Sequence, residues 1–480
     1  MLLNSLFTKF VDKKPFTVMA RAMLERMLSA SRLDEFFRTH ASSQYERDLL
    51  FSQLVEVIAR VVTRVDRSVL KAIEALRDVL TVTDDAVYQK LQGVEPAVCQ
   101  ALVRDSFREA RQVIAELKVE APSWLPKFRV KVLDGNSLAA TEHRIAELRT
   151  MWDAPLPGRS LVVWDQATRL VSDVFLSECG HASERSLLGQ VLETIEKRDL
   201  WIADRNFCTL GLLFGLWSGE ARFVIRQHGT LVGKPVGQPR LVGKTASGEP
   251  VFEQAVTLTH EGLERTVRRI TVHLKQPTRD GDTQLHVLTN LTKREASAVK
   301  VAELYQGRWT IEVVFHELTM ALRCEVNTLG YPKAALFVFC VALMLENTLT
   351  MLMGSLRSVH GDEAVEELST DALSCELPGT YEGLMAAIPP EEWVPIGTLP
   401  LSEFVKLLQS LAQRVDVVRY RKTPPRPQET PTQTREVSQR RPRLHRQNAS
   451  PAKCREMTPR KPCPEGCRGW LDEECFLADG

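Results

Sequence analysis

The sequence has almost no net charge, although it is rich in ionisable residues. Its 480 residues include 62 Lys and Arg against 61 Asp and Glu, which leaves a net charge of +1. Hydrophobic residues make up 44% and charged residues 26%, which is an ordinary soluble composition. The overall balance therefore gives no evidence for a polyanion-binding surface, and such a surface has to be argued from local features.

Long apolar runs and paired cysteines are also missing. The N-terminus has no apolar stretch followed by a small-residue cleavage site, so no secretory signal is predicted. The most apolar run, Ala334–Leu345, is too short to span a bilayer. It predicts a buried helix, and no association with a membrane is expected. Six scattered cysteines predict reduced thiols in the cytoplasm: Cys99, Cys179, Cys208, Cys324, Cys340 and Cys375.

The end of the chain, residues 419–480, is predicted to be a disordered basic tail. Between Arg419 and Lys461 there are thirteen Lys and Arg against three acids, and apolar residues are sparse. A solvated charge run explains this composition, and affinity for DNA is compatible with it. Four cysteines lack the paired spacing of a zinc site, so free thiols are the first interpretation and a zinc knuckle the second: Cys454, Cys463, Cys467 and Cys475.

The first 122 residues are predicted to be helical. Apolar residues recur at helical spacing through Leu49–Val62, Val69–Leu80 and Val98–Leu117. Between the last two, Thr81–Asp84 is typical of a capped start for a short helix. This arrangement suits a DNA-binding helix-turn-helix whose exposed residues are Tyr88, Gln89 and Lys90. A plain helical bundle explains the spacing as well, because the region lacks a dense Lys/Arg face.

After Pro122 the periodicity changes from helical to extended. Two strand-like runs end at aspartates, Asp134 and Asp204, and in open α/β sheets ligands bind beyond the carboxyl ends of strands. The predicted order is three strands, helix, strand, helix and strand, which is that of a ribonuclease-H-like α/β core. The segments are Phe128–Leu133, Ser160–Trp164, Arg169–Ser177, Ser183–Lys197, Leu200–Ala203, Thr209–Leu216 and Arg222–Arg226.

An all-β insertion is predicted to interrupt this core. Glycines punctuate residues 229–243, and Val/Thr-rich alternation follows through Val251–Leu258, Thr266–Leu274 and Gln284–Leu291. Helices resume near Lys293. The predicted division is a helical N-terminal DNA-binding domain (1–122), the first part of the core (123–226), the insertion (227–292), the last part of the core (293–357), a helical region (358–418) and the tail (419–480).

One stretch of the last core part, Glu303–Arg323, carries three functional side chains at helical spacing. Tyr305, Arg308 and Glu312 fall at i, i+3 and i+7, so on one α-helix they lie within about 60° of one another. An ordinary solvated Arg–Glu pair explains two of them. A separate apolar surface for docking is predicted from Trp309, Ile311, Val314, Phe315 and Leu318.

Asp134, Asp204 and Glu312 together predict a metal site. Carboxylates are hard oxygen ligands suited to Mg²⁺ or Mn²⁺, which take substrate phosphate oxygens as further ligands. Two such ions about 4 Å apart can activate an attacking oxygen and stabilise the leaving one. Each acid alone is weak evidence among 61 Asp and Glu, whereas all three in this order and on these elements form a constellation.

The segments VLDGN, ADRNF and YQGRWTIE resemble the three acidic motifs of bacterial insertion-sequence transposases of the DDE class. More narrowly, they resemble the cut-and-paste group with a β-rich insertion and a Tyr-x2-Arg-x3-Glu-x6-Lys signature. The resemblance implies that Asp134, Asp204 and Glu312 are catalytic and hold two Mg²⁺ or Mn²⁺ ions. It also implies that Tyr305 and Arg308 contact DNA phosphate, with Arg205 as a further candidate.

The same resemblance implies double-stranded DNA as the partner, both terminal inverted repeats and target DNA, a homodimer in the DNA complex, and a place at the bacterial nucleoid. One departure from the signature is Thr319, which stands where Lys is expected, so a phosphate contact is lost or supplied elsewhere, for instance by Arg323. Two alternatives remain: a non-catalytic DNA-binding relative of such enzymes, and a hydrolytic DNA nuclease of the same fold.

Overall fold

The computed structural model describes residues 5–422, apart from 45–46, 139–156, 279–280, 327–328, 370–371, 374–382 and 385–386. Residues 1–423 form one compact unit. The predictions made for the tail beyond residue 422, including its four cysteines, lie outside the described residues. The division of the chain into six parts stays a prediction, because residues 1–423, which include the first five parts, form a single compact unit.

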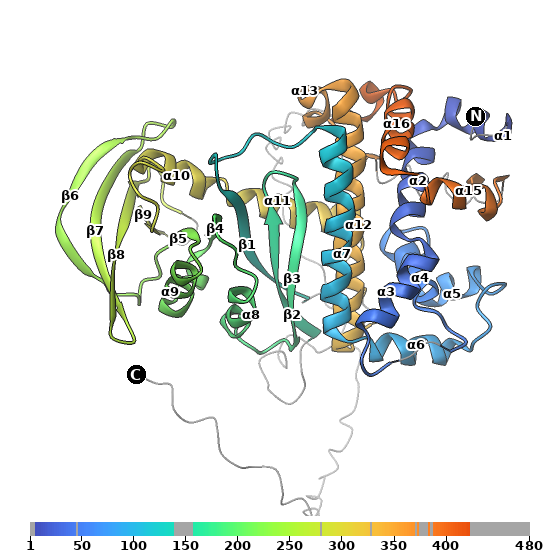
Figure 1. Ribbon diagram of the computed structural model, residues 1–480, viewed down its shortest axis with the longest axis horizontal. Coiled ribbons are helices and arrows are strands. Elements are labelled where there is room, and N and C mark those ends of the chain that lie inside the picture. Colours follow the sequence, from blue (N-terminus) through green and yellow to red (C-terminus); the bar gives the residue numbers. More distant parts are fainter. Residues whose placement is uncertain are drawn as a thin grey trace, which may run out of the picture. The chain divides into compact units, whose positions relative to one another are not determined.

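A nine-stranded sheet forms the centre of the fold, in the order β3-β2-β1-β4-β5-β9-β8-β7-β6 (Figure 1). Strands β1, β4 and β5 run parallel to one another, and β2 pairs antiparallel with both β1 and β3. The α/β class expected from the sequence is confirmed. The strands are β1 (Arg129–Ser137), β2 (Pro157–Asp165), β3 (Leu170–Cys179), β4 (Asp199–Ala203), β5 (Arg222–Arg226), β6 (Lys234–Lys244), β7 (Pro250–His260), β8 (Leu263–His273) and β9 (Gln284–Thr289).

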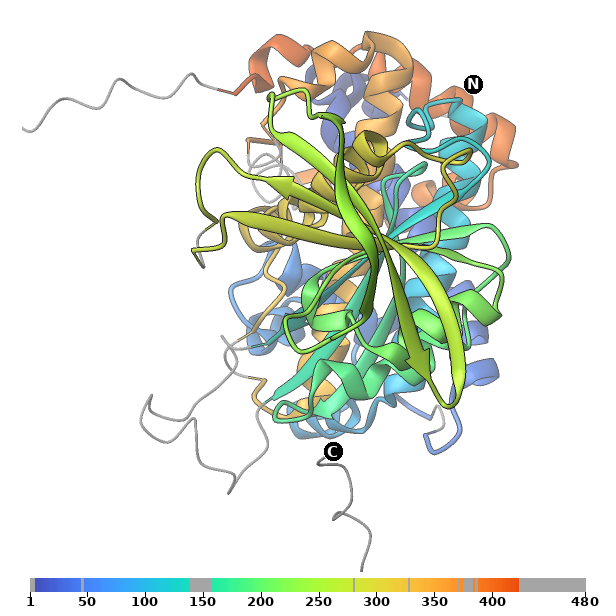
Figure 2. The same cartoon turned by 90° about the vertical axis from the view of Figure 1, so that its left-hand side faces the viewer.

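The strands expected in the insertion do not form a sheet of their own. Strand β9 pairs antiparallel with β5, with Ile225 opposite Leu288, so β6–β9 extend the sheet that begins at β3. Figure 2 shows these added strands in front of the rest of the unit. Helix α10 (Ala298–Gln306) contacts β5 to β9 and helix α9 (Leu210–Ser218) contacts β7. Helices on either side of the insertion in the sequence therefore pack against its strands.

The helical prediction for the N-terminal region agrees with the structure. Its helices are α1 (Ser5–Lys13), α2 (Pro15–Met27), α3 (Ala30–His40), α4 (Phe51–Val62), α5 (Val69–Ala75), α6 (Asp84–Gly93) and α7 (Pro96–Leu117). Thr83 caps α6 by accepting from the backbone N–H of Ala86. The Lys90 ammonium donates to the carbonyl of Leu49 and lies over the Phe37 ring, so it is used inside the bundle. These contacts favour the plain-bundle alternative for this segment.

Two long helices, α7 and α12 (Pro332–His360), run side by side between the sheet and the N-terminal helices α1–α6 (Figure 1). Helix α12 is longer than the apolar run predicted, and by length and composition it could cross a membrane. However, 89% of its most apolar window is buried inside the protein, where it contacts α7, β3, β2 and α4. The predicted buried helix is confirmed.

One buried amide fastens α12 to the sheet. Asn347 accepts the backbone N–H of Val171 on β3 and donates to the Val171 carbonyl, and it also donates to the hydroxyl of Ser106 on α7. These three bonds satisfy polar groups in a region that otherwise excludes water. They also fix the position of the α7–α12 layer along the strand.

Two predicted helices are interrupted in the structure. The helix expected over Ser183–Lys197 consists of a 3-10 turn, η3 (Glu184–Leu187), and the short α8 (Leu188–Leu192), because the Asp199 carboxylate accepts the N–H of Glu196 and turns the chain into β4. The single helix expected over Glu303–Arg323 consists of α10 and α11 (Trp309–Ala321), with the break at Gly307 and Arg308.

The C-terminal part of the unit is helical as expected, with α13 (Asp362–Glu366), α15 (Pro390–Gly397), α16 (Leu401–Ala412) and the turn η5 (Val417–Tyr420). The N–H of Lys422 donates to the carbonyl of Glu367, and the N–H of Ser369 to that of Tyr420. The folded unit therefore runs to residue 422, past the predicted start of the tail at 419.

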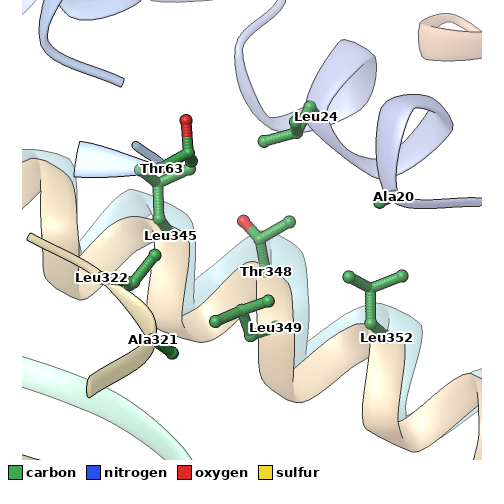
Figure 3. Close-up of a pocket in the computed structure, with 9 residues that line it drawn as sticks. All are labelled: Ala20, Leu24, Thr63, Ala321, Leu322, Leu345, Thr348, Leu349 and Leu352. Carbon is green, nitrogen blue, oxygen red and sulfur yellow. The ribbon is translucent and has the colours of Figure 1, made fainter. Parts of the chain in front are cut away.

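The Asn347 contacts predict a large effect of Asn347→Ala on stability. The substitution leaves the Val171 peptide without its partner and removes one of the two bonds of the Ser106 hydroxyl, which still donates to the carbonyl of Val103. We expect the free energy of unfolding to fall by about 2–3 kcal/mol. Thr348→Val is the matched control, because the Thr348 hydroxyl bonds only to its own helix and borders a small apolar pocket (Figure 3). Denaturant unfolding of both variants measures the difference, and equal losses would contradict this role of Asn347.

Candidate functional site

The two aspartates expected at the site are neighbours at one edge of the sheet. Strands β1 and β4 are parallel and in register up to Leu133 and Ala203, so the next residues, Asp134 and Asp204, lie beside each other. Asp204 follows its strand as predicted. Asp134 does not, because β1 continues to Ser137 along β2, and the aspartate lies inside the strand.

The third acid reaches this edge through the break between α10 and α11. Gly307 lies against the indole of Trp124, where an added Cβ would come within 2.6 Å of the ring. This close approach turns the chain between the two helices. Tyr305 therefore projects from the end of α10 and Glu312 from the first turn of α11, and they are not on one straight helix as expected.

Hydrogen bonds connect all three acids to two side chains of this segment. The Tyr305 hydroxyl donates to Asp204 Oδ1 at 3.1 Å. The Arg308 guanidinium donates from Nη1 to Asp134 Oδ2 at 3.2 Å and from Nη2 to Glu312 Oε1 at 2.7 Å. The structure thus brings together the five residues Asp134, Asp204, Tyr305, Arg308 and Glu312.

The charges of the acids also act on one another. Burial raises the pKa of Asp134 from 3.8 to about 6; the Arg308 cation and the Gly135 N–H oppose this effect, and the charges of Asp204 and Glu312 add to it. Burial also raises the pKa of the Tyr305 hydroxyl, and Asp204 reinforces that shift. The Tyr305 hydroxyl therefore keeps its proton and donates a hydrogen bond, and the edge of the sheet carries a concentration of negative charge.

Arg205 and one arginine that the sequence did not single out lie at the rim of this cluster. Arg226 ends β5, the third parallel strand, and its guanidinium pairs with Asp282 at 2.5 Å; Arg205 lies 3.5 Å from the same carboxylate. The charge of Arg226 acts on the Tyr305 hydroxyl. The position of Arg226 in the sequence could have identified it, because it is the last residue of β5, and β5 pairs with β4, the strand that precedes Asp204.

A fourth acid, Glu184 on η3, was also missed. Its carboxylate accepts from the Asn206 amide at 2.6 Å and lies so close to Gly135 that a Cβ there would meet it at 2.5 Å. Gly135 follows Asp134 and Asn206 follows Arg205, so Glu184 holds the two aspartate segments against one side of η3. Nothing in the spacing of the sequence marks this residue.

The apolar docking surface predicted on α11 is only partly correct. Ile311 and Val314 are buried, but Trp309 is 61% exposed and Val313 54% exposed, so both lie on the outer face next to Glu312. The side chains of Leu318 and Thr319 lie outside the described residues. Arg323, considered as a replacement for the missing Lys, donates to the carbonyl of Arg67.

The donor chemistry of the three carboxylates fits a hard divalent cation, which prefers oxygen ligands. In the part of the chain that the structure describes, however, no three His, Cys, Asp or Glu side chains are arranged to hold one metal ion. Instead, the Arg308 guanidinium bridges Asp134 and Glu312 and pairs with both. The oxygen donors of these acids suit such an ion, whereas their arrangement around Arg308 does not hold one.

Known proteins are similar to this chain in the region that contains the site. A family model described as transposase DDE domain matches residues 127–345, which include all three acids. A curated protein of Sinorhizobium fredii, provisionally named transposase y4zB, is 31% identical over 169 residues. That match covers 34% of this chain and 45% of the relative, so the chain spans about half the length of the protein it matches.

The raised pKa of Asp134 predicts a pH-dependent effect of Asp134→Asn on stability. The folded protein holds the Asp134 proton more tightly than the unfolded chain, so this group favours folding below about pH 4 and ceases to do so as pH rises through 6. In the presence of a chelator we expect the variant to be more stable than the wild type by about 1–2 kcal/mol at pH 8 and nearly equal to it at pH 4.

Unfolding in denaturant at several pH values measures this difference. Asp85→Asn, on the exposed side of α6, controls for the general loss of a negative charge. A stability difference for Asp134→Asn that stays constant from pH 4 to pH 8 would show that burial does not destabilise this carboxylate.

The contact of Gly307 with Trp124 predicts that Gly307→Ala destabilises the protein by about 1–3 kcal/mol, because the indole is packed and cannot make room without shifting the helix break. Gly211→Ala on α9 is the control, since open space surrounds that position, and we expect no loss there. Thermal or denaturant unfolding distinguishes the two; a harmless Gly307→Ala would mean that the break does not depend on this contact.

Proposed function

We propose that the protein is a transposase that cleaves DNA at the ends of an insertion sequence and joins those ends to target DNA, because residues 127–345 match the model of the transposase DDE domain. The observation that carries the proposal is the convergence of Asp134, Asp204 and Glu312 on Arg308 and Tyr305. These acids are separated by up to 178 positions in the chain yet act on one another electrostatically.

We further propose that the first five strands form a ribonuclease-H-like core. Their spatial order is β3-β2-β1-β4-β5. Strands β1, β4 and β5 are parallel to one another, and β2 is antiparallel to β1. Asp204 then lies at the carboxyl end of β4, and Asp134 lies beside it, where β1 no longer pairs with β4. Ligands of open α/β sheets bind at this edge. Strands β6–β9 are an insertion between β5 and α10, the helix that leads to Glu312.

In this proposal Asp134, Asp204 and Glu312 hold two Mg²⁺ or Mn²⁺ ions. When bound, such ions activate the attacking oxygen and neutralise charge on the phosphate. Asp134 has to be ionised to serve as a ligand, and its raised pKa means that protons compete for it up to about pH 6. Divalent ions and neutral or mildly alkaline pH should therefore support activity together.

The remaining residues of the cluster bind and orient DNA. Arg308 offers two parallel N–H donors, which suit a phosphate oxygen pair, and the Tyr305 hydroxyl offers a further hydrogen-bond donor. Arg205 and Arg226 add positive charge at the rim, where the flanking phosphates would lie. No side chain has to act as a nucleophile, because positioning and charge neutralisation supply the rate in such reactions.

Two in-line displacements at phosphorus make up the proposed reaction. Water first breaks the phosphodiester bond at the end of the element and releases a 3′-hydroxyl group. That hydroxyl then attacks a phosphorus atom of the target backbone and loses its proton. The new P–O bond forms as the bond to the target's own 3′-oxygen breaks, and that oxygen departs as a 3′-hydroxyl group. The partners are duplex DNA of the terminal repeats and the target, and a second copy of the chain in the DNA complex.

The proposal predicts that Asp134→Asn, Asp204→Asn and Glu312→Gln each reduce cleavage by at least about 10³-fold while binding of terminal-repeat DNA is retained, because each removes a ligand and not the DNA surface. Glu303→Gln is the matched control, since Glu303 is exposed on α10 and faces Lys300. Gel assays of cleavage with Mg²⁺, Mn²⁺ or chelator, and of DNA binding in parallel, measure both effects.

Three results are distinguishable. Metal-dependent cleavage with joined products supports the transposase. Cleavage without joined products would identify a hydrolytic nuclease, and DNA binding without any cleavage would identify a non-catalytic relative. Normal cleavage by one of the three variants would remove that residue from the site.

A further inference from the structure

The position of Arg308 has a consequence for how the site is loaded. Its side chain is 9% exposed, and its two terminal nitrogens donate to Asp134 and Glu312. Its Nε is buried and has no hydrogen-bond partner among the described residues. The guanidinium is thus held by charge at two of its nitrogens and leaves a donor unsatisfied, which makes the arrangement costly to keep.

The guanidinium and a divalent cation compete for the same oxygens. Both are attracted by Asp134 and Glu312, and at a separation of a few ångströms two cations repel each other strongly in a partly buried site. A metal ion can therefore bind these carboxylates well only when Arg308 has moved away. Conversely, the acids would be left as neighbouring negative charges if Arg308 moved away and nothing replaced it.

DNA provides the group that can take Arg308 away from the acids. A phosphate offers two oxygens to the guanidinium fork as a carboxylate does, and it can also satisfy the nitrogen that now lacks a partner. Arg308 can change partners locally, because it lies at the break between α10 and α11 and not within either helix. Glu312 is 55% exposed at the side chain, so the metal-binding face is open to solvent once the pair separates.

We propose that Arg308 is an exchangeable counter-ion: it neutralises Asp134 and Glu312 in the free protein and transfers to a DNA phosphate when DNA binds, so that DNA and divalent metal ions bind cooperatively. This rests on the function proposed above. Since coupling between two ligands is reciprocal, metal ions should raise the affinity for DNA by the same factor by which DNA raises the affinity for metal.

The coupling can be measured on metal binding alone, without activity. The full chain is titrated with Mn²⁺, and free Mn²⁺ is followed by electron paramagnetic resonance, with and without a pre-cleaved duplex of the terminal repeat. We expect the duplex to tighten Mn²⁺ binding by about tenfold or more, within the usual range of coupling between two sites. The Mn²⁺ that the duplex binds by itself is subtracted from a titration without protein.

Arg308→Gln should mimic the effect of DNA. Without the guanidinium we expect Mn²⁺ to bind about tenfold more tightly to the DNA-free protein, and the duplex should bring little further gain. Arg308→Lys keeps the charge and should stay close to the wild type. Arg222→Gln is the matched control: it breaks a paired arginine–carboxylate contact on β5, with Glu295, outside the cluster.

The outcomes separate this proposal from the proposed function. If the wild type binds Mn²⁺ equally well with and without the duplex, the exchange is wrong even where metal-dependent cleavage occurs. If Arg308→Gln does not fold, the wild-type comparison still decides. A third outcome concerns the metal site itself. If Glu312→Gln does not reduce Mn²⁺ binding, either in the presence of the duplex or in the Arg308→Gln background, the metal site is wrong and the proposed function fails with it.

Discussion

Negative charge gathered at one edge of a sheet has to be balanced, and much of this site follows from that requirement. Asp134 is largely buried, and Asp204 and Glu312 act on it from nearby. Unpaired, such acids would hold protons or force the segment open. Arg308 supplies the balancing charge, and Tyr305 supplies a hydrogen bond to Asp204. The same two side chains offer the donors that a phosphate would need, so the groups that stabilise the free protein and those that would bind DNA coincide.

The scaffold under this charge cluster is fixed by ordinary packing. Parallel register places Asp134 beside Asp204, and the contact of Gly307 with Trp124 sets the break from which Arg308 projects. Behind the sheet, α7 and α12 form a buried layer that Asn347 fastens to β3. The acidic edge therefore rests on elements with little freedom to relax, which is how a protein retains a cluster of like charges at a functional site.

The added strands β6–β9 are connected with this edge, because β9 pairs with β5 and the Asp282 carboxylate before β9 binds both Arg205 and Arg226. Charge at the rim of the site is thus set partly by the insertion. In the proposed function, DNA that reaches the carboxylates would also contact the inserted strands. Related proteins that differ in the loops at this junction would therefore differ in the DNA that they bind.

The class of fold, most strands of the sheet and the buried helix could be predicted from the sequence, because alternation and helical periodicity follow local burial. Asp134 and Asp204 could be selected because each follows a strand-like run, and Tyr305, Arg308 and Glu312 because of their spacing within one segment and its resemblance to a known motif. The breaks of the helices could not be predicted, because they depend on contacts such as Gly307 against Trp124 and Glu196 against Asp199. Only the tertiary structure joined β9 to β5 and revealed Arg226, Glu184 and the ion pairs of Arg308, because contacts between residues far apart in the chain depend on packing that no local period records.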